Sequence, residues 1–488
     1  MKAMQNEAGR RQKQARLGGS LALPVWVFCS AFCILHSAFA AAPEHCSQSS
    51  GTPAGNSAFC ILHSAFAAAE HCSQSIGTPA AAPKPSIVIV VLDDCGVDKL
   101  PCYGIGCDAP SLPTIEGLAS AGLRFAHAYA APLCSPTRAM LQTGRYGFRT
   151  GMGNVIGNWQ SLTEYDLPLA ETTIAERLPR MRCGMAGKWH LASQISGGIA
   201  APLNQGWDVF DGTMVNLQFG PQEGYYDWLR VTGGATVVET QYATTVEIDA
   251  AIAMAQSLPR PFVLLVALSA PHAPWHYPPA GLYDVQLAGD PDANPPPFFN
   301  AALQAADAEL ARLLAVLPEE TLGFLLGDNG TPGQAMCGPF DPEKEKGTVY
   351  EGGVRVPLIA WGAGVTPGVC DALVHAPLDV YASALRAGGF LGPLRDGVAL
   401  QPYLSDAQHA PLRDSIYVEV FKPNGFVTHT TYDRAVRDTR WKLVERSGFA
   451  PELYDLDADP YEAVDRAADG IDGEEQAAID QLENLWPQ

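Results

Sequence analysis

Uninterrupted apolar runs punctuate the chain beyond residue 85. Three of them read SIVIVVL at residues 86–92, PFVLLVAL at 261–268 and LGFLL at 322–326, and a fourth candidate covers residues 356–361. A strand that is buried on both faces shows such a continuous run, whereas a half-exposed strand alternates apolar and polar residues. The pattern therefore predicts inner strands of one sheet.

Segments with a helical period lie between these runs. Within residues 301–317, apolar side chains recur every three or four positions, as they do along the buried face of a helix. Buried strands that alternate with amphipathic helices are typical of an α/β domain. We expect a catalytic domain at residues 85–400, built on a large, mostly parallel sheet flanked by helices.

The last part of the chain has a shorter period. Residues 415–420, 434–439 and 441–445 are short alternating segments, and residues 474–485 resemble a terminal helix. Alternation is typical of an antiparallel sheet with one face toward the core. We expect a C-terminal α+β subdomain at residues 401–488, with a small antiparallel sheet and one helix.

The first residues have the pattern of a secretory signal. Five basic residues precede a mostly apolar stretch at residues 17–35, and Ala38-Phe39-Ala40 forms a small-x-small cleavage site. This predicts a signal peptide at residues 1–40, export to the periplasm or the extracellular space, and no stable membrane insertion after cleavage. An uncleaved anchor is the alternative, although Pro24 and His36 interrupt a run that is marginal for a span of about 20 residues.

A tandem duplication follows the cleavage site. Residues 30–54 and 57–80 are nearly identical, and two copies are too few for a solenoid. We expect residues 41–84 to be an Ala/Ser/Pro-rich linker derived from this repeat.

Composition narrows the function. The 488 residues are 47% hydrophobic, which predicts a packed core, and 52 acids against 31 bases give a formal net charge of -21. Such a charge disfavours nucleic acid and anionic membranes as partners. The twelve cysteines are too scattered for a zinc pattern, and some of them can pair in an oxidising compartment.

Two acidic turns follow the first and third apolar runs. Asp93 and Asp94 come directly after residue 92, and Asp328 and Asn329 follow residue 327. Ligands of open parallel sheets bind beyond the carboxyl ends of the strands. Adjacent carboxylates repel each other unless a cation neutralises them, and oxygen ligands suit calcium or magnesium. Each motif alone also fits an ordinary turn.

A third motif carries a cysteine. In the segment Cys134-Ser135-Pro136-Thr137-Arg138, the proline is well placed in the first turn of a helix. Cys134 would then lie at the helix N-terminus, where the dipole lowers the pKa of a thiol, so we expect a reactive cysteine. A buried structural cysteine is the alternative.

Taken in order, these motifs make the chain resemble the type I sulfatase family of the alkaline phosphatase superfamily, from residue 86 to about residue 462. The Cys-x-Pro-x-Arg core is intact, with Thr137 where the family usually has serine. Further matching motifs are Gly187-Lys188-Trp189-His190-Leu191, Pro271-His272-Ala273-Pro274, Gly327-Asp328-Asn329-Gly330 and Lys346-Gly347-Thr348.

The resemblance implies an alkaline phosphatase-like fold and a set of residue roles. A formylglycine-generating enzyme would oxidise Cys134 to formylglycine. One Ca²⁺, rather than Mg²⁺, would be bound by an oxygen of this modified residue together with Asp93, Asp94, Asp328 and Asn329. Arg138 and Lys188 would neutralise charge near the nucleophile, His190 would assist the aldehyde hydrate, and His272 and Lys346 would contact the sulfate. The implied function is hydrolysis of a sulfate ester, in a small molecule or a glycan, to an alcohol and inorganic sulfate.

Two other functions fit the same motifs. One is hydrolysis of phosphonates or phosphate diesters by an enzyme of the same superfamily. The other is binding of sulfate esters by a protein whose Cys134 stays unmodified. The aromatic-rich loops at residues 205–234 and 276–299 are candidates for contacts with the alcohol part of a substrate, or for simple loop packing.

Overall fold

The computed structural model describes residues 84–217, 224–468 and 470–488. These residues all belong to one compact unit. The predicted signal peptide, and all but the last residue of the predicted linker, lie outside the described residues. Among the described residues, no helix is both long and apolar enough to span a bilayer.

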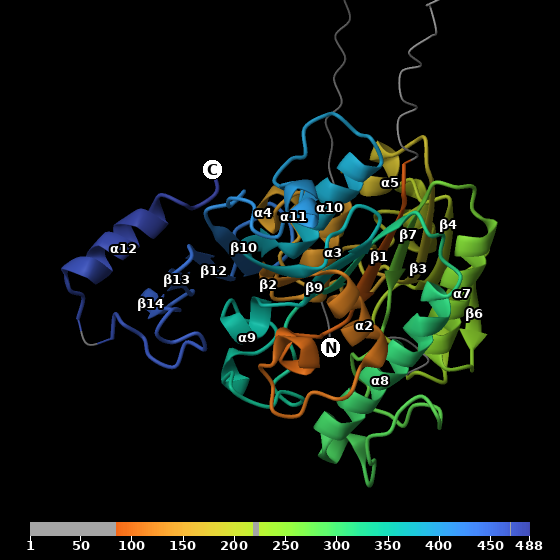
Figure 1. Ribbon diagram of the computed structural model, residues 1–488, viewed down its shortest axis with the longest axis horizontal. Helices are drawn as coiled ribbons and strands as arrows, with labels where there is room; N and C mark the ends of the chain where they lie inside the picture. The colour runs from red at the N-terminus through yellow and green to blue at the C-terminus, as the bar shows by residue number, and fades with distance from the viewer. Residues whose placement is uncertain (1–83, 218–223, 469) are drawn as a thin grey trace, which may run out of the picture. The chain divides into compact units, whose positions relative to one another are not determined.

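A sheet of ten strands forms the centre, in the order β10-β2-β9-β8-β1-β7-β3-β4-β5-β6 (Figure 1). Strand β1 (Ser86–Leu92) pairs in parallel with β7 (Phe262–Ala267) and with β8 (Thr321–Gly327). Every residue of these three strands is buried, which explains their continuous apolar runs. The predicted inner strands are confirmed.

The fourth run forms β9 (Leu358–Gly362), which is antiparallel to β8 and to β2 (Leu123–Tyr129). Most of the other neighbours are parallel, and an antiparallel hairpin forms one edge, so the mostly parallel α/β class is confirmed. The remaining strands are β3 (Arg182–Lys188), β4 (Val209–Thr213), β5 (Trp228–Thr232), β6 (Ala235–Glu239) and β10 (Gly368–His375).

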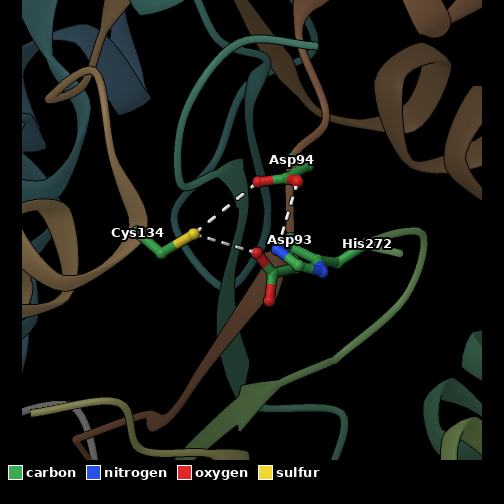
Figure 2. Close-up of side chains that lie close together, drawn as sticks. All are labelled: Asp93, Asp94, Cys134 and His272. Atoms are coloured by element: carbon green, nitrogen blue, oxygen red, sulfur yellow. Dashed lines mark hydrogen bonds and ion pairs between the residues drawn. The ribbon is translucent and has the colours of Figure 1, made fainter. Parts of the chain in front are cut away.

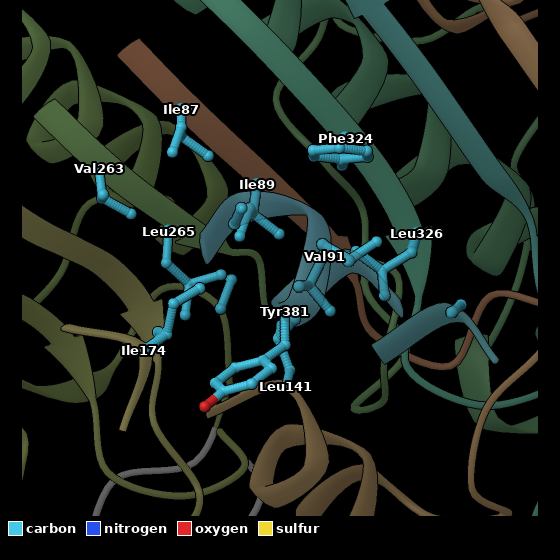
Figure 3. Close-up of a cluster of buried hydrophobic side chains, with 14 of the residues drawn as sticks. Ile87, Ile89, Val91, Leu141, Ile174, Val263, Leu265, Phe324, Leu326 and Tyr381 are labelled. Carbon is cyan, nitrogen blue, oxygen red and sulfur yellow. The ribbon is translucent and has the colours of Figure 1, made fainter. Parts of the chain in front are cut away.

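Both faces of β1 are covered. Ile87, Ile89 and Val91 point into a core shared with α3 (Cys134–Thr143) and α10 (Ala376–Ala387), seen in Figure 3. The alternate side chains of the strand lie in a second core with α7 (Ala243–Ser257) and α8 (Pro295–Leu314). The other helices are α2 (Pro113–Ala121), α4 (Gly147–Thr150), α5 (Ile174–Arg177), α6 (Ala201–Asn204), α9 (Glu351–Val354) and α11 (Gln401–Ser405).

The helix predicted at residues 301–317 exists, but both of its predicted ends are wrong. It begins at Pro295, because prolines in the first turn of a helix lose no backbone hydrogen bond there. It ends at Leu314, and Leu317 packs against the core from the following loop.

The C-terminal sheet is antiparallel, as predicted, in the order β11-β12-β13-β14. Its strands are β11 (Ile416–Lys422), β12 (Thr431–Arg437), β13 (Trp441–Glu445) and β14 (Glu452–Asp455). Helix α12 (Gly473–Glu483) packs Ala478 and Leu482 against this sheet, and Asp472 caps its N-terminus.

One disulfide joins two loops at the same edge of the central sheet. Cys107 lies in the loop after β1 and Cys337 in the loop after β8, 230 residues further along the chain. The same two loops begin with the predicted acidic turns. The described free cysteines are Cys95, Cys102, Cys134, Cys183 and Cys370.

Candidate active site

The two acidic turns meet because β1 and β8 are parallel neighbours that end side by side. The backbone N–H of Asp94 donates to Asp328 Oδ1 at 3.0 Å, and Asn329 Nδ2 donates to Asp94 Oδ1 at 2.9 Å. Asp94 has a φ of 66°, in the left-handed region that Asp and Asn tolerate best among non-glycine residues. All four side chains, including Asp93, are buried.

Helix α3 brings Cys134 to this point as its first residue. The Sγ atom lies 3.3 Å from Asp93 Oδ1 and 3.6 Å from Asp94 Oδ1 (Figure 2). The prediction of an acidified thiol is wrong. Burial, followed by the negative charges of Asp328 and Asp93, raises the pKa of Cys134 well above its usual value, although the residue begins a helix.

Arg138, four residues further along α3, contacts both the second acidic turn and the end of β3. Its Nε and Nη2 atoms lie 3.1 and 2.9 Å from Asp328 Oδ2, and Nη1 donates to the carbonyl of Lys188 at 2.7 Å. Burial and the nearby Asp93 raise the pKa of Asp328 to about 6, although Arg138 opposes this shift.

Two lysines pair with the two adjacent aspartates. Lys188, at the end of β3, forms a buried ion pair with Asp93, and Lys346 lies 2.6 Å from Asp94. Burial raises the pKa of Asp93, but Lys188 and other cationic groups outweigh burial and hold that pKa well below its usual value. The nearby Lys344 points elsewhere, toward the hydroxyl of Tyr454 at 3.2 Å.

His272 follows β7 at the same edge. Its Nε2 atom lies 3.4 Å from Asp94 Oδ2, and Nδ1 is 2.6 Å from the carbonyl of Ala273 (Figure 2). Burial lowers the pKa of His272 to about 4, against the opposing effect of Asp94. The hydroxyl of Tyr225 holds this turn by donating to the carbonyls of Ser269 and His272.

His190 is fully buried beside the helix that carries Cys134. Its Nε2 atom lies 2.9 Å from the carbonyl of Ile156, and its backbone carbonyl accepts from Ser135 Oγ at 2.8 Å. The Nδ1 atom is buried and has no hydrogen-bond partner among the described residues. Burial, with the positive charges of Lys188 and Arg138, holds the pKa of His190 well below its usual value.

The site has the donors for a divalent cation. Asp93, Asp94, Cys134 and His272 offer ligand atoms that all lie within 4.8 Å of one another. Asn329 Oδ1 is a buried oxygen without a partner in the described part of the chain, beside the carboxylate of Asp94. Carboxylate and amide oxygens are the ligands that Ca²⁺ prefers, so these residues fit such an ion.

Supporting residues of the site were not predicted from the sequence. The buried Glu247 of α7 accepts from the hydroxyl and the backbone N–H of Ser269, three residues before His272. The sequence of α7 carries a second acidic residue, Asp249, two positions further on, so the pattern alone did not single out Glu247 as the buried one. The contact between Ser135 and Ile156 left no signal in the sequence, since it joins helix α3 to a loop that lies 21 residues away along the chain.

The predicted aromatic loops divide into buried and exposed side chains. Tyr225 is buried and stacks on His276 with 3.8 Å between ring centroids, and Trp228 is buried as well. Tyr226 and Tyr277 are 42% and 43% exposed, and Tyr226 donates its hydroxyl to the carbonyl of Tyr277. Residue 219, another aromatic of the first loop, lies outside the described residues.

Known proteins share this fold. Ps i-CgsB bound to k-i-k-neocarrahexaose superposes with a TM-score of 0.69 at 23% identity, covering 82% of this chain and 92% of that one. The PsFucS1 sulfatase from Pseudoalteromonas sp. superposes with a TM-score of 0.64 at 22% identity, covering 82% and 89%.

Sequence comparison identifies the family. The family model described as Sulfatase matches residues 85–390. Arylsulfatase A from Homo sapiens is 31% identical over 382 residues, which cover 69% of this chain and 71% of the relative. N-acetylgalactosamine-6-sulfatase from Canis lupus familiaris is 29% identical over 377 residues, covering 67% and 68%. The chain therefore belongs to the type I sulfatase family and is a sulfuric ester hydrolase.

Proposed function

We propose that this sulfatase hydrolyses its sulfate ester with formylglycine at position 134 and one Ca²⁺ as cofactor. The observation that carries the proposal is the position of Cys134, whose Sγ atom lies 3.3 and 3.6 Å from two adjacent buried carboxylates. An unmodified thiol at this place has a raised pKa, so it would be a poor nucleophile. Oxidation of Cys134 by a formylglycine-generating enzyme removes that difficulty.

Formylglycine and calcium would have separate tasks in the reaction. Hydrated formylglycine would supply two hydroxyl groups, one as the nucleophile toward sulfur and one that allows the sulfate to leave when it loses its proton. Calcium would be held by Asp93, Asp94, Asp328 and Asn329 and would stabilise negative charge at the reacting atoms.

The chain's own side chains would bind and orient the substrate. Lys346 and His272 lie on the Asp94 side of the site and are the candidates for contacts with sulfate oxygens. His272 is the candidate for protonating the departing alcohol. Arg138 and Lys188 hold the carboxylates in place, and the Nδ1 atom of His190, which has no partner among the described residues, can take a proton.

The local charges explain how an acidic protein would attract an anion. Asp93, Asp94 and Asp328 are balanced by three cationic side chains, those of Arg138, Lys188 and Lys346. A bound divalent cation would leave this buried site positive while the protein as a whole stays negative. Electrostatic attraction is strong in such a water-poor pocket.

The substrate class is a sulfated glycan or a sulfated small molecule. The curated relatives are named as sulfatases of aryl esters and of N-acetylgalactosamine 6-sulfate. The exposed rings of Tyr226 and Tyr277 can stack on a sugar or an aryl group. The disulfide between Cys107 and Cys337 favours an oxidising compartment, in agreement with export to the periplasm or beyond.

Mass spectrometry of the tryptic peptide that contains Cys134 tests the modification directly. Formylglycine lowers the peptide mass by about 18 Da relative to cysteine. An unmodified peptide from an active preparation would contradict the proposal. An unmodified peptide from an inactive one would favour a binding protein.

Steady-state kinetics test the reaction and the metal. We expect kcat/KM to be highest for a sulfate ester when sulfate, phosphate-diester and phosphonate esters of one alcohol are compared. Dialysis against a calcium chelator should abolish turnover, and Ca²⁺ should restore it better than Mg²⁺. A preference for the phosphonate would indicate the alternative hydrolase.

A further inference from the structure

The turn between β11 and β12 reaches from the C-terminal sheet to a loop of the catalytic domain. Asn424 Oδ1 accepts hydrogen bonds from the backbone N–H groups of Gly153 and Asn154, at 3.0 and 2.7 Å. Asn424 Nδ2 donates to the carbonyl of Asn154 at 3.0 Å. Because two N–H groups face one atom, that atom must be the amide oxygen, which fixes the orientation of the side chain.

The backbone at the end of β11 and in the turn adds two further contacts. Phe421 donates its N–H to the carbonyl of Gly153 at 3.2 Å, and Gly425 donates to the carbonyl of Gly151 at 2.8 Å. A Cβ atom at Gly153 would lie 2.3 Å from the ring of Phe421, so the two segments are in close contact. Asn424 is half-buried by this arrangement.

The clamped loop ends at a residue that holds His190. The carbonyl of Ile156 lies 2.9 Å from His190 Nε2. The N–H of Ile156 donates to Ser135 Oγ at 3.1 Å, and that hydroxyl donates to the carbonyl of His190. Ser135 is the neighbour of Cys134, so the loop links the C-terminal turn to the nucleophile and its histidine.

These contacts decide which nitrogen of His190 carries the proton. A carbonyl only accepts hydrogen bonds, so Nε2 must be the protonated nitrogen and Nδ1 carries the lone pair. Nδ1 is buried and has no partner among the described residues, so its lone pair is free to accept a proton.

We propose that Asn424 is a positioning residue for sulfate release, acting through Ile156 to hold His190 with Nδ1 as the proton acceptor. In this step Nδ1 takes the proton of the remaining hydroxyl on residue 134. The electron pair of the O–H bond forms the carbonyl, and the C–O bond to sulfate breaks, with its pair leaving on inorganic sulfate. The inference rests on the proposed formylglycine chemistry.

The kinetic test uses the matured enzyme and its Asn424→Ala variant. Slower sulfate release should lower kcat and KM together, by about tenfold, and leave kcat/KM nearly unchanged, since only a step after alcohol release is affected. Rapid-quench experiments should then show a burst of alcohol and an enzyme population that carries covalent sulfate. Val427→Ala, an exposed change in the same turn, should behave like the wild type.

A structural test uses protein in which Cys134 is unmodified. Long-range ¹H–¹⁵N spectra of the wild type should show His190 as a single tautomer protonated at Nε2. Asn424→Ala should show a mixture of tautomers, and Asn424→Asp, which keeps the oxygen acceptor, should restore much of the wild-type signal.

Two outcomes would overturn the inference: an Asn424→Ala enzyme without a burst, or an unchanged tautomer. A loss of kcat/KM without a burst would indicate a role in folding alone. If the proposed function itself is wrong, the wild-type enzyme will lack formylglycine or will not turn over sulfate esters, whatever Asn424 does.

Discussion

Charged side chains at the site lie against opposite charges, so we expect single substitutions there to have large effects on activity that can be measured separately. Lys346 is the cation that lies on Asp94 and is proposed to contact the sulfate. Lys346→Ala should lower kcat/KM by about 10²- to 10³-fold, as the loss of one charge-stabilising donor does in other enzymes. Steady-state assays on an aryl sulfate measure this loss.

Lys344 is the matched control, two residues away in the same loop. It packs on the rings of Tyr350 and Tyr454, 4.6 Å from each centroid, and does not contact the site. Lys344→Ala should change kcat/KM less than tenfold. An equal loss in both variants would mean that loop stability, rather than charge at Asp94, controls the rate.

Cys134→Ser tests the need for two hydroxyl groups on residue 134. A serine has one hydroxyl, so it could accept sulfate but could not expel it by forming an aldehyde. We expect at most one turnover per enzyme, with the protein mass raised by one sulfuryl group. Sustained turnover by this variant would refute the mechanism.

The buried carboxyl group of Glu247 should make the stability of the fold depend on pH. Burial raises its pKa from 4.5 to about 7, so the folded state binds the proton more tightly than the unfolded chain does. The free energy of unfolding of the wild type therefore falls as the pH rises from 5 to 8, whereas Glu247→Gln has no carboxyl group to titrate there. The difference in unfolding free energy between the variant and the wild type should shift in favour of the variant by roughly 2–3 kcal/mol between pH 5 and pH 8. Chemical denaturation at the two pH values measures the gain, and an equal difference at both would contradict it.

At the scale of elements, a buried ion cluster joins β13 to α9. Lys442 Nζ lies 3.0 Å from Glu351 and 2.8 Å from Glu462, and all three side chains are buried. Lys442→Met removes the cation shared by two buried carboxylates and leaves only Arg437, 3.7 Å from Glu351, as an ion-pair partner among the described residues, so it should destabilise the fold by about 3–5 kcal/mol. The shift in the midpoint of denaturant unfolding measures this loss.

Arg434→Met on the neighbouring strand β12 is the control. Arg434 pairs with Glu445, but its side chain is 37% exposed. An exposed pair contributes at most about 1 kcal/mol, so this variant should stay close to the wild type. Similar losses in both variants would mean that burial of the Lys442 cluster is unimportant.

Elements buried on both faces, and the mostly parallel arrangement of their strands, were predictable from the sequence, but the antiparallel exception β9 was not. Strand β1 was predicted to the residue because every side chain from Ser86 to Leu92 is buried. The same apolar pattern is compatible with either strand direction, so nothing distinguished antiparallel β9 from its parallel neighbours. Strand β2 was missed because its partly buried residues interrupt the apolar run.

The acidic turns could be located for a similar reason. Asp93 and Asp328 directly follow predicted strands, and parallel strands end at one edge of a sheet. Contacts between loops could not be predicted, because they depend on how distant segments pack. The disulfide from Cys107 and the hydrogen bonds of Asn424 to Gly153 and Asn154 are of this kind. The thiol pKa of Cys134 was wrongly predicted because the density of buried carboxylates exists only in the folded protein.

At the scale of the whole molecule, the Cys107–Cys337 disulfide closes a loop of 230 residues. Cys337→Ser should lower stability by about 2–5 kcal/mol, because the unfolded chain regains the entropy that the crosslink removed. Thermal unfolding measures the loss, which should disappear when both proteins are compared in reductant.

Cys102→Ser is the control for that change, since Cys102 is a free, half-buried cysteine five residues from Cys107. It should have little effect in either redox condition. A Cys337→Ser protein as stable as the wild type in oxidising buffer would show that the crosslink does not limit unfolding.

The near-cancellation of charge around Asp94 has a consequence for how the enzyme would respond to its surroundings. Because the protein's own groups offset one another, capture of the ester would depend on whether the ion is bound. If that ion is calcium, thermodynamic linkage requires that bound ester raises the affinity for calcium by the same factor by which bound calcium raises the affinity for the ester. The rate of sulfate ester hydrolysis would therefore follow the calcium concentration of the surrounding fluid.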